Sequence, residues 1–163
     1  ANLHTAKSAA SNGVSGETHG YTAGGGQTDQ IQKFQYSSQS TGTDVANLLA
    51  GTGTNQAGAT ASTTHGYIVG SAMVGTPPSR VIQKFPFASD TNSTNVGNLI
   101  TPGVFLPGTA SATTHGYRAG GEYAGGGNPV DTIDKWANAS DGDATDVGNL
   151  EHTQNYMGQG SQY

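Results

Sequence analysis

Three histidines in a repeated phrase are the side chains that first suggest chemistry. The phrase Thr-His-Gly-Tyr occurs three times and places His19, His65 and His115 in the same local context. Three imidazoles brought towards one axis would suit a tetrahedral zinc ion. Repetition favours a different explanation, because a structural need recurs in every repeat whereas a single metal site does not. We therefore predict no metal and no other cofactor, and we expect each histidine to hydrogen-bond to backbone in its own or the next repeat.

The acidic stretch from Asp141 to Asp146 is a second candidate site. Its spacing, Asp-Gly-Asp-Ala-Thr-Asp, is similar to the start of a calcium loop, but the downstream bidentate glutamate is missing. The equivalent stretches, Gln39 to Asp44 and Asp90 to Asn95, do not keep the full set of carboxylates. A polar turn between two strands explains all three copies, so we predict a turn here and no bound calcium.

Two further polar positions recur and are predicted to be structural. Asp44, Asn95 and Asp146 each precede a valine, where they would accept backbone N–H bonds in a local Asx turn. Lysines recur beside an aromatic residue and are expected to pair with these side chains or to lie along the ring; they are Lys33, Lys84 and Lys135. No Ser/His/Asp set or carboxylate pair stands out, so we predict that the protein is not an enzyme.

The elements that would position these side chains form a repeat of about 50 residues. Ile31, Ile82 and Ile133 are 51 residues apart, and a Thr-(Asp/Asn)-Val-x-Asn-Leu phrase keeps the same step. Alternation of His19, Tyr21 and Ala23 with smaller residues indicates a strand. Each repeat is therefore predicted to contain four short antiparallel strands.

Aromatic residues at equivalent repeat positions are the predicted core. The rings expected to be buried between neighbouring sheets are Phe34, Phe85 and Trp136. The tyrosines of the Thr-His-Gly-Tyr phrase are further structural positions; they are Tyr21, Tyr67 and Tyr117.

We predict a single repeat domain over residues 1–163. The repeats span approximately residues 4–49, 50–99 and 100–150, and residues 151–163 supply the first strand of a fourth unit. Ala1-Asn2-Leu3 matches the Asn-Leu that ends each later repeat, so the chain begins on the tail of a unit. We expect the fourth-unit strand to pair with a continuation of the chain or with a neighbouring copy.

Composition excludes several classes of function. The net charge of −5 and only six Lys and Arg argue against nucleic-acid binding. No apolar run approaches the roughly 20 residues needed to span a bilayer. Cysteine is absent, and charged residues make up only 10% of the chain beside 26 glycines. This composition is typical of a stable protein on a virion or extracellular surface.

Four strands per repeat, a Gly-Gly after the second strand and an aromatic in the third together resemble kelch-type β-propeller blades. The wording from Thr114 to Gly121 and from Ile133 to Leu150 is similar to kelch-like repeats in virion structural and tail-associated proteins of marine bacteriophages. The resemblance implies an all-β propeller architecture and a virion setting. The alternative fold is a β-trefoil, which also has three units of four strands.

Two functions from different classes follow as expectations. The first is a non-enzymatic structural module of a phage-like virion or surface fibre, with other copies of itself or other virion or fibre proteins as partners. The second is a carbohydrate-binding module of a secreted or surface protein that binds glycans through Tyr and Trp rings in the loops between blades, such as Tyr123, Trp136 and Tyr163.

Overall fold

A computed structural model describes the chain in eight segments, and all regular structure in them is β-strand, as predicted. The described segments are residues 2–7, 12–26, 28–49, 56–71, 79–101, 104–123, 127–154 and 158–160. In these segments there is no helix with the length and apolar character to cross a membrane.

The first sheet contains four antiparallel strands paired in chain order. They are β1 (Asn12–Ser15), β2 (His19–Ala23), β3 (Gln30–Gln35) and β4 (Thr43–Asn47). After β2, Gly24 and Gly25 adopt φ angles of 65° and 83°, a conformation that favours glycine and turns the chain towards β3. The Gly-Gly that follows the repeated histidine phrase is therefore a strand terminator.

The second sheet repeats this arrangement. Its strands are β5 (Gly58–Ala61), β6 (His65–Ser71), β7 (Ser79–Pro86) and β8 (Thr94–Asn98). Each of the first two repeats thus forms one sheet on its own. A β-trefoil would share the strands of all units in one barrel, so the trefoil alternative is wrong.

The third sheet has the same four-stranded centre and additional short strands. The centre consists of β10 (Gly108–Ser111), β11 (His115–Ala119), β13 (Asn128–Ala137) and β14 (Thr145–Gln154). The short additions are β9 (Val104–Phe105), β12 (Glu122–Tyr123) and β15 (Gln159–Gly160). The described part of the expected fourth-unit strand, β15, pairs in parallel with β10 of the same chain. Our expectation that it pairs outside the three repeats is wrong for these residues.

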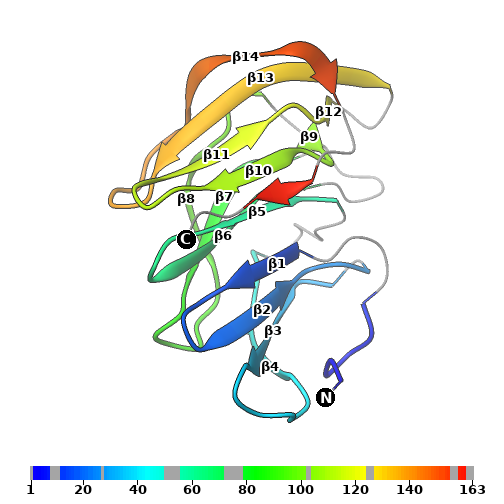
Figure 1. The fold of residues 1–163 in the computed structure, drawn as a ribbon, viewed down its shortest axis with the longest axis vertical. Coiled ribbons are helices and arrows are strands. Elements are labelled where there is room, and N and C mark those ends of the chain that lie inside the picture. The colour runs from blue at the N-terminus through cyan, green and yellow to red at the C-terminus, as the bar shows by residue number, and fades with distance from the viewer. Residues whose placement is uncertain are drawn as a thin grey trace.

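The three sheets follow one another along the longest axis of the molecule (Figure 1). Their first strands, β1, β5 and β10, contact one another in that order. Between β5 and β10, Thr109 donates its hydroxyl to the carbonyl of Ala59 at 2.7 Å, and Ser111 Oγ accepts the N–H of Ala61 at 2.9 Å. Among the described residues the sheets do not close into a ring.

The core lies between the sheets, in two layers. The layer between the first and second sheets includes Tyr21, Ile31, Ile68 and Phe85. The layer between the second and third sheets includes Tyr67, Val69, Ile82, Leu99 and Trp136. Neighbours in β6 alternate between the layers, because successive side chains of a strand point to opposite faces. The middle sheet is therefore buried on both faces, whereas in the part of the chain that the structure describes each outer sheet has one face without a neighbouring sheet.

Candidate interaction site: the contacts between repeats

Each repeat closes around a glycine that lies under an aromatic ring. Gly20 is paired with Phe34 across the strands, Gly66 with Phe85, and Gly116 with Trp136. A Cβ built on any of these glycines would lie under 3.0 Å from atoms of the paired ring. This contact explains why the phrase reads His-Gly-Tyr, and it confirms that the three rings are equivalent.

Burial of these rings follows the position of the repeat in the stack. Phe85 and Trp136 are 2% and 3% exposed, as predicted, but Phe34 is only half-buried. The prediction for Phe34 is wrong because, among the described strands, none packs against the face of the first sheet that carries this ring.

The tyrosines of the first two repeats pack against aromatic residues of the next repeat. Tyr21 stacks on Phe87 with ring centroids 4.9 Å apart and meets Phe85 edge-on at 5.6 Å. Tyr67 lies 6.4 Å from Trp136. The hydroxyls of Tyr21 and Tyr67 donate to the carbonyls of Phe87 and Asn138 at 3.4 and 3.2 Å. Burial raises the pKa of both tyrosines, so both rings serve packing.

The three histidines do not gather at a common site. Each ring Nδ1 lies 2.8 Å from the hydroxyl oxygen of the preceding threonine, in the pairs Thr18–His19, Thr64–His65 and Thr114–His115. Our expectation that each histidine hydrogen-bonds to backbone is therefore wrong, because the partner of Nδ1 is a side-chain hydroxyl. In the described segments no three His, Cys, Asp or Glu side chains form a group that could hold a metal ion.

Lysine and aspartate join neighbouring repeats. Lys33 pairs with Asp90 at 3.0 Å, and Lys84 pairs with Asp141 in the same way one repeat later. Our expectation that these lysines pair with Asp44 and its equivalents, or lie along the ring, is wrong, because the partner lies in the next repeat.

The acidic stretch of the third repeat is also a contact between repeats. Asp143 Oδ1 accepts the backbone N–H and the side-chain N–H of Asn98 at 2.8 and 3.1 Å. Asp141 pairs with Lys84, and Asp146 Oδ1 accepts the N–H of Gly148 at 2.9 Å. These three carboxylates bind three different protein groups, which supports the prediction of a turn over that of a calcium loop.

The predicted Asx turns are present at two of three positions. Asn95 Oδ1 accepts the N–H of Gly97 at 3.0 Å, in the same way that Asp146 binds Gly148. Each bond spans an irregularity in the pairing of the third and fourth strands, and the corresponding irregularity beside Asp44 lies at Ile31 and Gln32. In each repeat the valine that follows the Asx residue is left out of the pairing register, a β-bulge.

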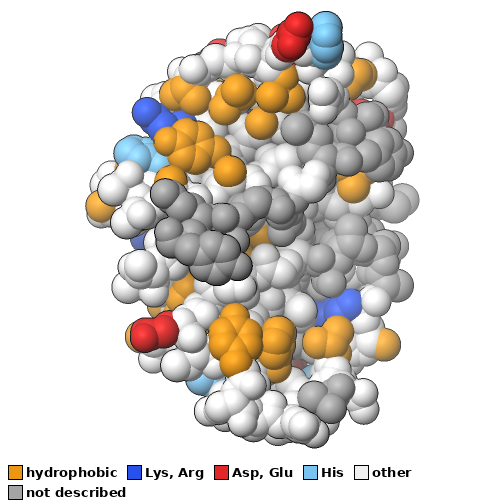
Figure 2. All heavy atoms as spheres, viewed as in Figure 1, with side chains coloured by type: hydrophobic (Ala, Val, Ile, Leu, Met, Phe, Trp, Pro, Cys, Tyr) orange, Lys and Arg blue, Asp and Glu red, His pale blue; other side chains and the backbone are white. Residues whose placement is uncertain are grey.

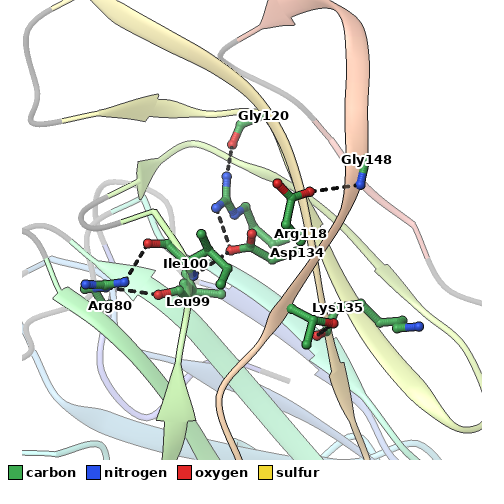
Figure 3. Close-up of polar contacts among 10 residues, drawn as sticks. Arg80, Leu99, Ile100, Arg118, Gly120, Asp134, Lys135 and Gly148 are labelled. Atoms are coloured by element: carbon green, nitrogen blue, oxygen red, sulfur yellow. Dashed lines mark hydrogen bonds and ion pairs between the residues drawn. The ribbon is translucent and has the colours of Figure 1, made fainter.

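A fully buried ion pair lies inside the third repeat and was not predicted from the sequence. Arg118 Nη2 lies 2.6 Å from Asp134 Oδ2, both side chains have no exposed surface, and Arg118 Nη1 donates to the carbonyl of Gly120 at 3.0 Å (Figure 3). Asp134 Oδ2 also accepts the N–H of Ile100 at 3.3 Å.

The signal for this pair was present in the repeat alignment. Asp134 stands where the earlier repeats have Gln32 and Gln83, and Arg118 stands where they have Thr22 and Ile68. Gln83 Oε1 accepts the N–H of Leu49 at 2.8 Å, which is the bond that Asp134 makes to Ile100. Aspartate therefore keeps the acceptor role that joins successive repeats, and arginine neutralises the added charge.

The rings considered for ligand binding differ in accessibility. Trp136 is buried and cannot stack on a sugar, whereas Tyr123 is 41% exposed. Tyr163 lies outside the described residues. Tyr36, which sequence reasoning missed, is 52% exposed and lies edge-on to Phe34 with ring centroids 6.1 Å apart.

Comparison of the sequence with protein-family models and with curated proteins gives no match.

Proposed function

We propose that this chain is a non-enzymatic structural module, a stack of propeller-like blades that serves assembly or attachment. Three four-stranded antiparallel sheets whose first strands lie side by side support a blade-like architecture of the kelch type.

The observation that carries the proposal is the repetition of one set of contacts between repeats. The N–H of Asn47 donates to Asn92 Oδ1 at 2.9 Å, and the N–H of Asn98 donates to Asp143 Oδ1 at 2.8 Å. The carbonyls of Asn47 and Asn98 accept the N–H groups of Ser93 and Ala144 at 2.9 and 2.8 Å. Polar side chains that recur in this chain are thus used to join one repeat to the next.

The setting we propose is a phage-like virion or a surface fibre, with other copies of the chain or other virion or fibre proteins as partners. The repeated wording similar to virion proteins supports this setting, as do the low charge and the lack of cysteine. Nucleic acid and membrane are not among the proposed partners.

Immunogold electron microscopy of intact particles or cells from the native source tests the proposal. An antibody against the chain should label particles or fibres at regular intervals. Antigen recovered only as free protein, with no label on any particle or fibre, would contradict a structural role.

Carbohydrate binding is the second candidate, and the exposed rings of Tyr123 and Tyr36 favour it. Aromatic side chains with an accessible face provide large, rigid contact area at low entropic cost. Titration of the monomer with an array of oligosaccharides tests this candidate. A saturable isotherm that Tyr123→Ala or Tyr36→Ala abolishes would favour it over the structural role.

A further inference from the structure

The outward face of the third sheet is equivalent to the surface through which each of the first two repeats contacts the next. In the first two repeats this surface packs against the next sheet; its tyrosine, isoleucine and leucine are buried and its valine is half-buried. Among the described residues, no sheet packs against the equivalent surface of the third repeat. We call this surface the C-terminal apolar face; it consists of Tyr117, Ile133, Val147 and Leu150.

Equivalent side chains are more exposed in the third repeat than in the first two. Ile31 and Ile82 are fully buried, but Ile133 is only half-buried. Leu48 and Leu99 are 3% and 1% exposed, but Leu150 is half-buried. A vacant surface of this kind is the usual mark of an interaction site.

Val147 and Gly148 differ in the same way from the equivalent residues of the second repeat. Val147 is 46% exposed, whereas the equivalent Val96 packs against the core. Gly97 lets the loop of the next repeat approach so closely that a Cβ there would meet the backbone of Gly142 under 3.0 Å. The equivalent Gly148 has nothing within 4 Å of its own Cβ position. The third repeat therefore keeps the room for an incoming loop.

Two aromatic rings of the first sheet form the matching half of the contact. Phe34 and Tyr36 occupy the positions of Phe85 and Phe87, the two rings on which Tyr21 packs. With Phe34 half-buried and Tyr36 exposed, these rings offer the same surface to the tyrosine of a preceding repeat, and Tyr117 is that tyrosine in the third repeat. On the face shown in Figure 2, hydrophobic side chains lie over the region of the third sheet and over that of the first.

The polar groups of the two ends also match, though more weakly than inside the chain. Lys135 corresponds to Lys33 and Lys84, and the residue it would meet on the first repeat is Gln39, in the place of Asp90. The N–H of Asn149 would meet Thr41, in the place of Asn92. Gln39 is an acceptor without charge, which predicts a weaker contact with Lys135 than the ion pair of Lys33 with Asp90 inside the chain.

Residues 2–7 and β15 make hydrogen bonds of the kind that a neighbouring repeat makes. The carbonyl of Asn2 accepts the N–H of Gly42 at 2.8 Å, and the N–H of His4 donates to Gln32 Oε1 at 3.0 Å. These are the bonds that Asn47 and Leu49 make to the second repeat. At the other end, β15 lies along β10 with Gln159 opposite Thr109, where the first strand of a further repeat would lie.

We propose that copies of this chain associate head to tail, with the C-terminal apolar face of one copy packed against Phe34 and Tyr36 of the next. Residues 2–7 and β15 compete with the incoming copy for the same hydrogen bonds. The contact joins two different surfaces, so it generates a ring or a filament rather than a two-fold dimer. This inference rests on the proposed structural role and names the surface through which that role would be exerted.

Analytical ultracentrifugation of the full chain over a range of concentrations tests the inference. We expect reversible association that Val147→Asp weakens at least tenfold, because the variant places a charge in an apolar contact. The double variant Gln39→Asp with Thr41→Asn restores the loop found at Asp90 and Asn92. It should strengthen association about tenfold, on the order of one charge-assisted contact.

Two controls make the test specific. Ser37→Asp adds the same charge as Gln39→Asp in the same turn and should leave the association constant unchanged. Deletion of residues 2–7 should strengthen association, with circular dichroism used to check that the strands remain.

The inference is overturned if association is insensitive to Val147→Asp and to the double variant, in which case the structural role still stands with another surface. It is also overturned if every variant remains monomeric up to about 1 mM, the limit of weak specific binding. A strictly monomeric chain that binds sugar saturably would count against the structural role as well.

Discussion

The indole ring of Trp136 lies over Gly116 on the neighbouring strand, and this pair closes the interior of the third repeat. The same relationship holds for Phe34 with Gly20 and for Phe85 with Gly66. A ring can cross the strand only where the opposing residue has no side chain.

Gly116→Ala should therefore destabilise the protein by about 1–3 kcal/mol, the usual cost of overpacking a filled core. The free energy of unfolding can be followed in urea by the fluorescence of Trp136, the single tryptophan of the chain. Gly13→Ala is the matched control, because Gly13 also lies in a strand but has nothing within 4 Å of its Cβ position. Equal losses for the two variants would contradict the role assigned to the ring.

Truncation of the repeated rings should show the position of each repeat in the stack. Phe85→Ala should cost about 3–5 kcal/mol, because the ring is fully buried between two sheets. Phe34→Ala should cost clearly less, because the same ring in the first repeat is only half-buried. Thermal unfolding of the two variants checks this order, and the reverse order would mean that the first sheet is covered.

The buried ion pair of the third repeat should tolerate replacement of both partners together but not replacement of Arg118 alone. Arg118→Ile alone leaves the Asp134 carboxylate buried without its cation and should cost about 3–5 kcal/mol. Adding Asp134→Gln restores the Ile68 and Gln83 combination of the second repeat, in which glutamine accepts the backbone N–H of Leu49. The double variant should recover most of the lost stability.

Denaturant unfolding of the two single variants and the double variant forms a mutant cycle. If the double variant is as unstable as the sum of the two single variants, the pair is not replaceable by the residues of the second repeat.

The repeat itself could be predicted from the sequence because its strands follow local patterns. The alternation of His19, Tyr21 and Ala23 and the 51-residue step of Ile31 define strands and register without any tertiary information. Four strands per repeat and the equivalence of Phe85 with Trp136 follow directly from that register.

Contacts between repeats could not be predicted in the same way, because they depend on how one sheet packs on the next. The partner of Lys33 lies 57 residues away in the second repeat, and no local pattern identifies Asp90 as its target. Likewise, the half-burial of Phe34 depends on which sheet is outermost and not on the repeat. Arg118 and Asp134 both differ from the residues at the equivalent positions of the other repeats. Their pairing could be found only by comparing two different strands, which the alignment of the repeats does not relate to each other.

The acidic stretch of the third repeat should be independent of calcium. Asp143→Ala removes the acceptor for both N–H groups of Asn98 and should cost about 1 kcal/mol. Asp143→Asn keeps that acceptor, as Asn92 does for Asn47 in the preceding contact, and should be tolerated. Melting temperatures of the unmodified chain and of both variants should be unchanged by EDTA or calcium. A calcium-induced rise in the melting temperature that Asp143→Asn abolishes would identify a metal site instead.

Protonation of His65 at mildly acidic pH should lower the free energy of unfolding. Burial, and then the nearby charge of Lys84, lower the pKa of His65, while Asp141 acts in the opposite direction. The folded state therefore binds this proton less readily than the unfolded state, whose histidine has a pKa of about 6.5. Stability from neutral His65 is present above that value and is lost as pH falls through the lower pKa of the folded protein.

Melting temperatures between about pH 7.5 and pH 5 check this expectation in a window that lies above the titration of ordinary carboxylates. His65→Gln should remove the His65 part of the decline, so that the melting temperature of the variant falls less over this range than that of the unmodified chain. His152→Gln is the control, because it makes the same substitution at a histidine that is exposed on β14. If His65→Gln and the unmodified chain decline in parallel, the neutral form of His65 contributes nothing to the stability of the fold over this pH range.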